Sequence, residues 1–283
     1  MKNTLIIFGG ADYESEAARK VAIEVGLNIA TAITADGKKV HAGNAYMATG
    51  FVLDHGNLEE VTGVVIFECA PVVAGELPVI LRADHHNPGD TGFGLGPEKF
   101  WEASSLGQLM NFIGLEPTEE QLIIAASDHC PAAAYKGLCP GIDPAAFAES
   151  RLQQKLVFFA GDPRNAHKAT RETLLAVIET AKAKLLSAPE VDGVRDLREA
   201  GYVDELPEAA LSLGLAYMTQ IPDTDRDRNL TGNTKILLGG HTTPEAVTKF
   251  MEWGNSLPNK VGPAYGNPIR GFAGVVITPE ISE

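Results

Sequence analysis

The stretch Leu77–Asp90, LPVILRADHHNPGD, carries the pattern that decides the fold. It opens with a short, mostly apolar run, which predicts a buried strand. That strand ends at Asp84-His85-His86, and Asn87-Pro88-Gly89 then turns the chain away. In open α/β sheets ligands bind beyond the carboxyl ends of the strands, so Asp84-His85-His86 would stand at such a position.

One carboxylate and two imidazoles in a row are donors that suit Mn²⁺, Fe²⁺ or Zn²⁺ better than Ca²⁺. The stretch therefore predicts a metal site at the end of this strand. The alternative is a polar turn in which the two histidines are incidental.

Bulk composition narrows the class of protein. The chain has 283 residues and a net charge of −14, from 23 basic and 37 acidic residues. Its length allows one large domain or two ordinary ones, and the acidic excess argues against an extended nucleic-acid surface. Three cysteines without a scaffold spacing, and no apolar run near the ~18–20 residues of a membrane span, predict a reduced, cytoplasmic protein with no membrane partner. Assembly into a homodimer stays open.

Two more strands are predicted to end in carboxylates. Thr4–Phe8 predicts a first strand rather than a signal peptide, and a helix at Glu16–Val25 follows a loop that contains Asp12 and Glu14. Thr62–Phe67 predicts a buried strand that ends on Glu68.

Carboxylates that share one cavity repel one another, and a bound metal removes that repulsion. For the first loop an alternative stays open, in which Gly9-Gly10 makes the turn and Asp12 or Ser15 caps the helix.

The middle of the chain supplies one more acidic candidate. A helix is predicted at Trp101–Ile113, and Thr118 with Gln121 forms a capping box before an apolar helix that ends at Asp128. An Asp at the end of a buried helix is costly unless it is paired, capped or metal-bound.

The glycine-rich segment Thr91–Pro97 predicts a surface loop, since it lacks the Lys and Ser/Thr of a P-loop. A zinc site at His129, Cys130 and Cys139 lacks a fourth ligand.

The sequence after residue 187 predicts a second α/β domain. Ser187–Glu190 marks a boundary, which gives domains at 1–187 and 188–283, the second smaller than the first. A strand at Thr234–Leu238 ends in Gly239-Gly240-His241 before a helix that Thr243 caps, and Arg270 precedes a last strand.

The ordered set of motifs resembles the DHH phosphoesterase superfamily. In that family a first strand ends in Asp-x-Asp, a second in Asp and a third in Asp-His-His, and a helix pair beginning near Ser-Ser leads to another Asp. The stretch SSLGQLMNFIGLEPTEEQLIIAASD adds to the likeness, whereas residues 235–253 resemble the family's C-terminal domain weakly. The counterparts here are Asp12-Tyr13-Glu14, Glu68, Asp84-His85-His86, Ser104-Ser105 and Asp128.

This chain departs from the family at three positions. Phe8 stands where the family commonly has a His, and Glu14 and Glu68 stand where it has Asp. The longer side chains would move a metal by about one methylene, so that one of two metal sites would be weak, relocated or absent.

The resemblance implies a divalent-metal-dependent hydrolase acting on a small phosphorylated substrate, such as a nucleotide, a short oligonucleotide or a polyphosphate. It implies that Asp84 orients His85 and that His86 contacts the phosphoryl group or protonates the leaving group. It implies that His241 and Arg270 hold the anionic end of the substrate, although Arg270 also fits a surface salt bridge. The implied ligands of one or two ions, Mn²⁺ first with Mg²⁺, Fe²⁺ or Zn²⁺ as alternatives, are Asp12, Glu14, Glu68, His85 and Asp128.

The fold expected is an α/β domain with a mainly parallel sheet and helices on both faces, followed by the smaller α/β domain, with the site in a cleft between them. Two other functions stay open: a non-catalytic nucleotide- or metal-binding protein of the same fold, and a metallohydrolase that acts on a non-phosphate bond.

Overall fold

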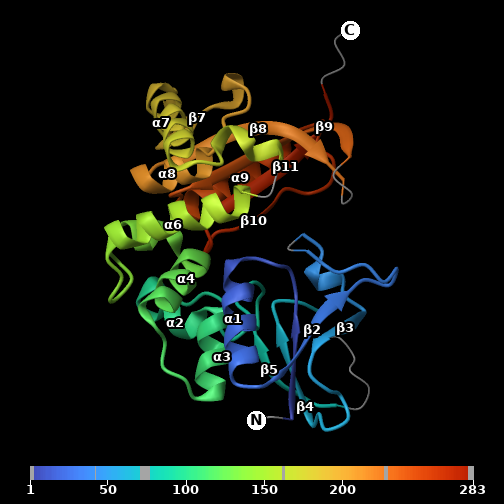
Figure 1. Ribbon diagram of the computed structural model, residues 1–283. Helices are drawn as coiled ribbons and strands as arrows, with labels where there is room; N and C mark the ends of the chain where they lie inside the picture. The colour runs from blue at the N-terminus through green and yellow to red at the C-terminus, as the bar shows by residue number, and fades with distance from the viewer. Residues whose placement is uncertain (1–2, 42, 71–76, 161–162, 226–228, 280–283) are drawn as a thin grey trace. The chain divides into compact units, whose positions relative to one another are not determined.

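The computed structural model describes residues 3–279, with gaps at 42, 71–76, 161–162 and 226–228 (Figure 1). The chain divides into two compact units, Met1–Asp143 and Pro144–Glu283. Each unit has its own sheet. Among the described residues no helix has the length and apolarity required to cross a membrane.

The first unit is built on a five-stranded sheet in the order β3-β2-β1-β4-β5. All neighbouring strands run parallel except β2 and β3, which are antiparallel. The mainly parallel sheet expected from the sequence is therefore present here. The strand order changes direction between β1 and β4, which is where open sheets bind ligands. The strands are β1 (Thr4–Phe8), β2 (Asn28–Ile33), β3 (Gly50–His55), β4 (Gly63–Phe67) and β5 (Val79–Ala83).

Side chains of the central strands alternate between two hydrophobic clusters because successive residues of a strand point to opposite faces. Ile6 and Phe8 lie in one cluster together with residues of helices α1 (Tyr13–Glu24) and α3 (Ser105–Ile113). Figure 1 shows these two helices on one side of the sheet. Leu5 and Ile7 lie in the other cluster, which is closed by Val40, Ala48 and the short 3-10 helix η1 (Ala45–Met47). The prediction of helices on both faces is wrong for the described residues, since a loop segment replaces them on the second face.

Strand β5 is an edge strand and not the buried strand predicted at Leu77–Ala83. Val79 and Ile80 are each 45% exposed, and only Ala83 at the end is fully buried. The apolar run gave a wrong prediction of burial because, among the described strands, β5 pairs with β4 alone. The strand and its polar end are nevertheless where the sequence placed them.

The helix predicted at Trp101–Ile113 is broken into α2 (Phe100–Ala103) and α3. Ser104 causes the break, since its extended backbone lets its Oγ accept a hydrogen bond from the Gly107 N–H at 3.0 Å. Helix α4 (Glu119–His129) begins with the capping box of Thr118 and Gln121, as predicted. Two short helices, η2 (Pro97–Lys99) and α5 (Pro131–Tyr135), flank this group.

The second unit has a six-stranded sheet in the order β10-β11-β9-β8-β7-β6, in which only β7 and β8 are parallel. It is nearly as long as the first unit, so it is not the smaller domain expected. Its strands are β6 (Glu190–Val191), β7 (Val194–Asp196), β8 (Ala216–Thr224), β9 (Leu230–Gly240), β10 (Tyr265–Asn267) and β11 (Phe272–Ile277). Its helices are α6 (Pro144–Phe159), η3 (Pro163–Lys168), α7 (Arg171–Ser187), η4 (Arg198–Ala200), α8 (Leu206–Leu213) and α9 (Pro244–Ser256).

The division at Asp143/Pro144 precedes the boundary predicted at 187/188 because α7 packs into the second unit. Ala181 and Leu185 of α7 share a hydrophobic cluster with Leu206 and Ala209 of α8. The Ser187–Glu190 segment is thus a connection within that unit.

A buried ionic network fixes η3 onto the start of α8. The Lys168 ammonium donates to Asp204 and to Glu205, at 2.7 Å each, and Lys168 is 5% exposed. Glu205 has a left-handed backbone with φ of 54°, which costs a non-glycine residue conformational energy. The charge pairs hold this strained position in place.

Replacing Lys168 with Met tests this network. Two carboxylates then lose a buried cation, while Glu205 keeps Lys155 and Asp204 keeps His167, so the unfolding free energy should fall by about 1–3 kcal/mol. The matched control is Lys182→Met, which removes a helix-surface pair with Glu179 and should cost under about 0.5 kcal/mol. Urea denaturation followed by circular dichroism measures both. Equal losses for the two variants would contradict the structural role of Lys168.

Candidate metal centre

Glu68 stands directly after β4, at the point where the strand order changes direction. Its backbone is left-handed, with φ of 50°, and its side chain is buried. Gly9 follows β1 next to it, and a Cβ atom on Gly9 would lie 2.1 Å from the Glu68 carbonyl oxygen. The glycine therefore lets the ends of β1 and β4 approach closely, which brings the loop of the first strand to Glu68.

Glu14, the second residue of α1, is buried beside Glu68. The N-terminus of α3 faces both carboxylates: the Leu106 N–H donates to Glu14 Oε1 at 3.1 Å, and the Ser105 hydroxyl donates to Glu68 Oε1 at 2.8 Å. The helix break at Ser104 makes these two donors available. Glu14 Oε2 is buried with no hydrogen-bond partner.

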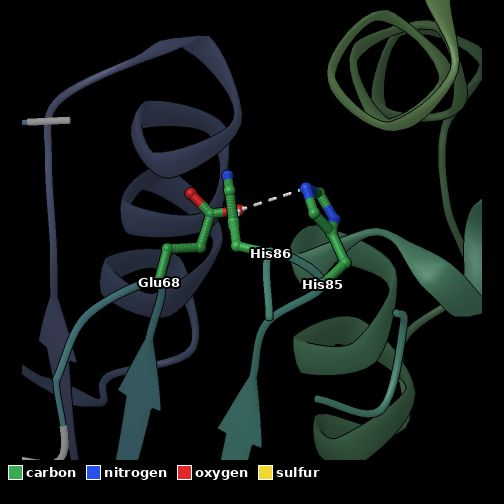
Figure 2. A group of neighbouring side chains, drawn as sticks. All are labelled: Glu68, His85 and His86. Carbon is green, nitrogen blue, oxygen red and sulfur yellow. Dashed lines mark ion pairs between the residues drawn. The ribbon is translucent and has the colours of Figure 1, made fainter. Parts of the chain in front are cut away.

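His85 and Asp128 complete the group. His85 Nε2 lies 3.0 Å from Asp128 Oδ2 and 4.0 Å from Glu68 Oε1, and neither ring nitrogen of His85 has a hydrogen bond of acceptable geometry. Ligand atoms of Glu14, Glu68, His85 and Asp128 all lie within 4.8 Å of one another. Figure 2 shows how Glu68 from β4 and the two histidines after β5 converge. The Asp128 side chain is 28% exposed, so this member is less buried than the sequence predicted.

Asp128 raises the proton affinity of the two buried glutamates. Burial, and then the charge of Asp128, hold the pKa values of Glu14 and Glu68 well above their usual range. Burial and the same Asp128 charge also raise the pKa of Asp12. A divalent cation would offset this repulsion, and three carboxylates with one imidazole are donors that Mn²⁺ accepts. Glu14 Oε2, which has no hydrogen-bond partner, and His85 Nε2, which faces Asp128 Oδ2 at 3.0 Å, are atoms that such an ion would bind.

Asp84 contacts the ring of His86 and not the ring of His85, which the resemblance had implied as its partner. The His86 Nδ1 atom lies 2.9 Å from Asp84 Oδ1. The backbone N–H groups of His85 and His86 also donate to this oxygen, at 2.8 and 3.0 Å. Burial raises the pKa of Asp84, but the hydrogen bonds from His86 and Tyr46 outweigh it and bring the pKa below its usual range. A charged Asp84 therefore fixes the proton of His86 on Nδ1.

Asp12 lies outside the cluster of four. Its Oδ1 accepts the Ser15 N–H at 2.7 Å and so caps α1, which is the alternative that the sequence left open. Phe8, where the resemblance implied a His, is fully buried, with its ring 5.0 Å from that of Phe67. Among the described residues two candidate ligand groups share Glu68 and His85: one adds Glu14 and Asp128, and the other adds His86.

The two predicted substrate contacts both lie in the second unit. His241 follows β9, where its N–H donates to the Leu215 carbonyl at 2.9 Å, and it is half-buried. Arg270 is exposed in the turn between β10 and β11. The structure joins their two loops, since the Thr242 hydroxyl donates to the Gly271 carbonyl at 2.7 Å.

Tyr46 and Gln108 hydrogen-bond to Asp84, and no sequence pattern predicted either of them. The Tyr46 hydroxyl, from η1, lies 2.9 Å from both carboxylate oxygens of Asp84. The Gln108 amide, from α3, donates to the Asp84 carbonyl at 3.0 Å and accepts the Asp84 N–H at 3.3 Å. Both contacts join segments distant in sequence, so no local pattern reveals them.

The glycine-rich segment Thr91–Pro97 is not a plain surface loop. A Cβ atom on Gly92 would lie 1.9 Å from the Ala103 carbonyl oxygen and 2.7 Å from the Cβ of His85. Gly92 is therefore required by packing against the site.

The structure does not support a zinc site at His129, Cys130 and Cys139. His129 Nε2 lies 2.9 Å from the Leu95 carbonyl oxygen, and the candidate metal groups found among the described residues contain no cysteine.

No protein-family model matches this chain, and no curated protein matches it in sequence. The geometry of the site therefore carries the functional argument.

Glu14→Gln tests whether the cluster is built for a cation. Without metal, folded Glu14 keeps its proton to higher pH than unfolded Glu14, so its contribution lowers stability as pH rises above about 4.3. The variant should therefore melt above wild type in EDTA at pH 8, and the difference should shrink toward pH 5.

Added Mn²⁺ should raise the melting temperature of wild type far more than that of Glu14→Gln. Glu16→Gln, an exposed change on the same helix, is the control and should behave like wild type. Equal Mn²⁺ stabilisation of all three proteins would contradict a metal role for Glu14.

Proposed function

We propose that this protein is a metal-dependent phosphoesterase that hydrolyses a small phosphorylated substrate. The observation that supports the proposal most is the buried group of three carboxylates and one imidazole at the switch point of a mainly parallel sheet. A second support is the polar pair Asp84 and His86 directly beside it. Buried like charges without a cation are expensive, and such clusters concentrate at functional sites.

Glu14, Glu68, His85 and Asp128 are the proposed ligands of one divalent ion, with Mn²⁺ the first candidate. When bound, such an ion supplies Lewis-acid polarisation of a phosphoryl oxygen. Ser105 and the Leu106 N–H keep the two glutamates oriented, and β5 with Gln108 holds the Asp84–His86 segment.

His86 is the proposed general acid. Its ring is stacked on that of His85, with centroids 4.5 Å apart, and its side chain is 30% exposed. Asp84 binds Nδ1, which leaves Nε2 to exchange a proton with the substrate. Protonated His86 would transfer this proton to the leaving oxygen, and the Asp84 carboxylate would stabilise the imidazolium before transfer.

His241 and Arg270 remain the predicted contacts for the anionic end of the substrate. His241 and Arg270 belong to two loops joined by the Thr242–Gly271 hydrogen bond. A guanidinium fork suits phosphate oxygens, which supports a nucleotide, a short oligonucleotide or a polyphosphate as the substrate class.

Phe8 supports a second candidate, a metal- or nucleotide-binding protein without catalysis. A phenyl ring in the core provides no ligand where the family has an imidazole, and Asp12 is engaged as a helix cap. Metal binding without hydrolysis of any phosphoester would favour this function. Hydrolysis of carboxylic esters or amides would instead indicate a metallohydrolase of another bond type.

The direct test is Mn²⁺-dependent hydrolysis of bis(p-nitrophenyl) phosphate by the full chain after removal and return of metal. Wild type should release p-nitrophenol only with Mn²⁺, and His85→Ala should fall to background together with its bound metal. His55→Ala, which changes an exposed imidazole on β3, is the control. Full activity of His85→Ala would contradict the proposal.

His86→Gln tests the general acid separately. Loss of acid catalysis costs about 10²–10⁴-fold, most for a leaving group that departs poorly without a proton. The loss in kcat should therefore be larger for a nucleoside phosphate, whose alkoxide is a poor leaving group, than for release of p-nitrophenol. Bound manganese should be unchanged in this variant. An equal loss for both kinds of leaving group would contradict the role in proton transfer.

A further inference from the structure

Two thiols lie in contact in the first unit, close in sequence to the metal centre. Cys130 separates α4 from α5, and Cys139 follows the turn after α5. Their sulfur atoms are 3.1 Å apart, and both are free thiols. The sulfurs of a disulfide are about 2.05 Å apart, so these two atoms lie about 1 Å farther apart than bonded sulfurs.

The backbone between the two cysteines already closes the loop. The N–H groups of Ala133 and Ala134 donate to the Cys130 carbonyl at 3.0 and 3.1 Å. The Leu138 N–H then donates back to the Ala133 carbonyl at 3.0 Å, and Gly137 makes the turn with φ of 69°. This local bonding holds the thiols together, so that linking them requires little further ordering of the chain.

The two sulfurs differ in access. Cys130 is half-buried, whereas Cys139 is 2% exposed. A small oxidant therefore meets Cys130 first and Cys139 second. The remaining cysteine, Cys69, is fully buried in the core beside the sheet and has no neighbouring thiol in the described residues.

We propose that Cys130 and Cys139 are a redox-active pair that closes to a disulfide by exchange with a low-molecular-weight disulfide such as oxidised glutathione. The Cys130 sulfur attacks one glutathione sulfur, the bond between the two glutathiones breaks, and one leaves as a thiol with the proton from Cys130. The Cys139 sulfur then attacks the Cys130 sulfur and displaces the second glutathione, which takes the proton from Cys139. The protein loses two hydrogens and two electrons, and one glutathione disulfide becomes two thiols.

The disulfide would fix the segment that follows Asp128, which lies two residues before Cys130. It would restrict the unfolded chain and so raise the melting temperature of the oxidised protein. This site does not depend on the proposed hydrolytic activity, since it rests on the two sulfur atoms and the backbone around them.

The test is to equilibrate the metal-free full chain in glutathione buffers of increasing oxidised fraction, alkylate the free thiols and measure intact mass and peptide masses. Wild type should lose two hydrogens, carry no glutathione, and keep one alkylatable thiol, at Cys69. Cys139→Ser, or Cys139→Ala if the first folds poorly, should instead retain one glutathione on Cys130. Only wild type should melt at a higher temperature after oxidation.

Three results would overturn the pair. Wild type that keeps glutathione on Cys130 would show that Cys139 does not attack it. Disulfide-linked dimers would show that the pairing is between chains. All three thiols still free, in a buffer that oxidises a reference dithiol peptide with the same spacing, would show that the fold opposes the bond.

Discussion

The fold of the first unit brings three carboxylates together at the switch point, and their mutual repulsion has to be neutralised. Glu68 holds a strained backbone conformation after β4, and Glu14 is delivered by the first turn of α1. Asp128 arrives from the end of α4 and raises the pKa of both. Such a group is costly to bury unless a cation or protons neutralise it. The rest of the site therefore has to orient these carboxylates and offset their charge.

The surrounding structure stabilises the carboxylates with uncharged hydrogen-bond donors. Ser105 and the Leu106 N–H, at the exposed end of a helix that Ser104 interrupts, point to the two glutamates. Glycines at positions 9 and 92 remove the side chains that would otherwise collide with neighbouring carbonyl oxygens. Hydrogen bonds of this kind keep the acids oriented, but they supply no net positive charge. A divalent ion would complete the charge balance.

Much of this site could be predicted because its members follow local signals. The polar residues at the ends of β1, β4 and β5, and the capping box of α4, are visible as patterns in sequence. Long-range packing could not be predicted: in the described part of the chain β5 is an exposed edge that pairs with β4, and the second face is covered by Val40, Ala48 and the short helix η1 in place of α-helices. Asp84 was assigned to the wrong histidine, since proximity in sequence does not fix a ring's direction. Tyr46 and Gln108 act across long sequence separations, and α7 joins the second unit through a core that no motif marks.

The central claim is that Glu14, Glu68, His85 and Asp128 together bind one divalent cation. The most direct measurement is a crystal structure of the full chain with Mn²⁺, using anomalous scattering at the manganese edge. The account predicts a single strong peak bonded to these four side chains, and its loss in a crystal of Glu68→Gln. No peak among them, or a peak bound elsewhere in wild type, would contradict it.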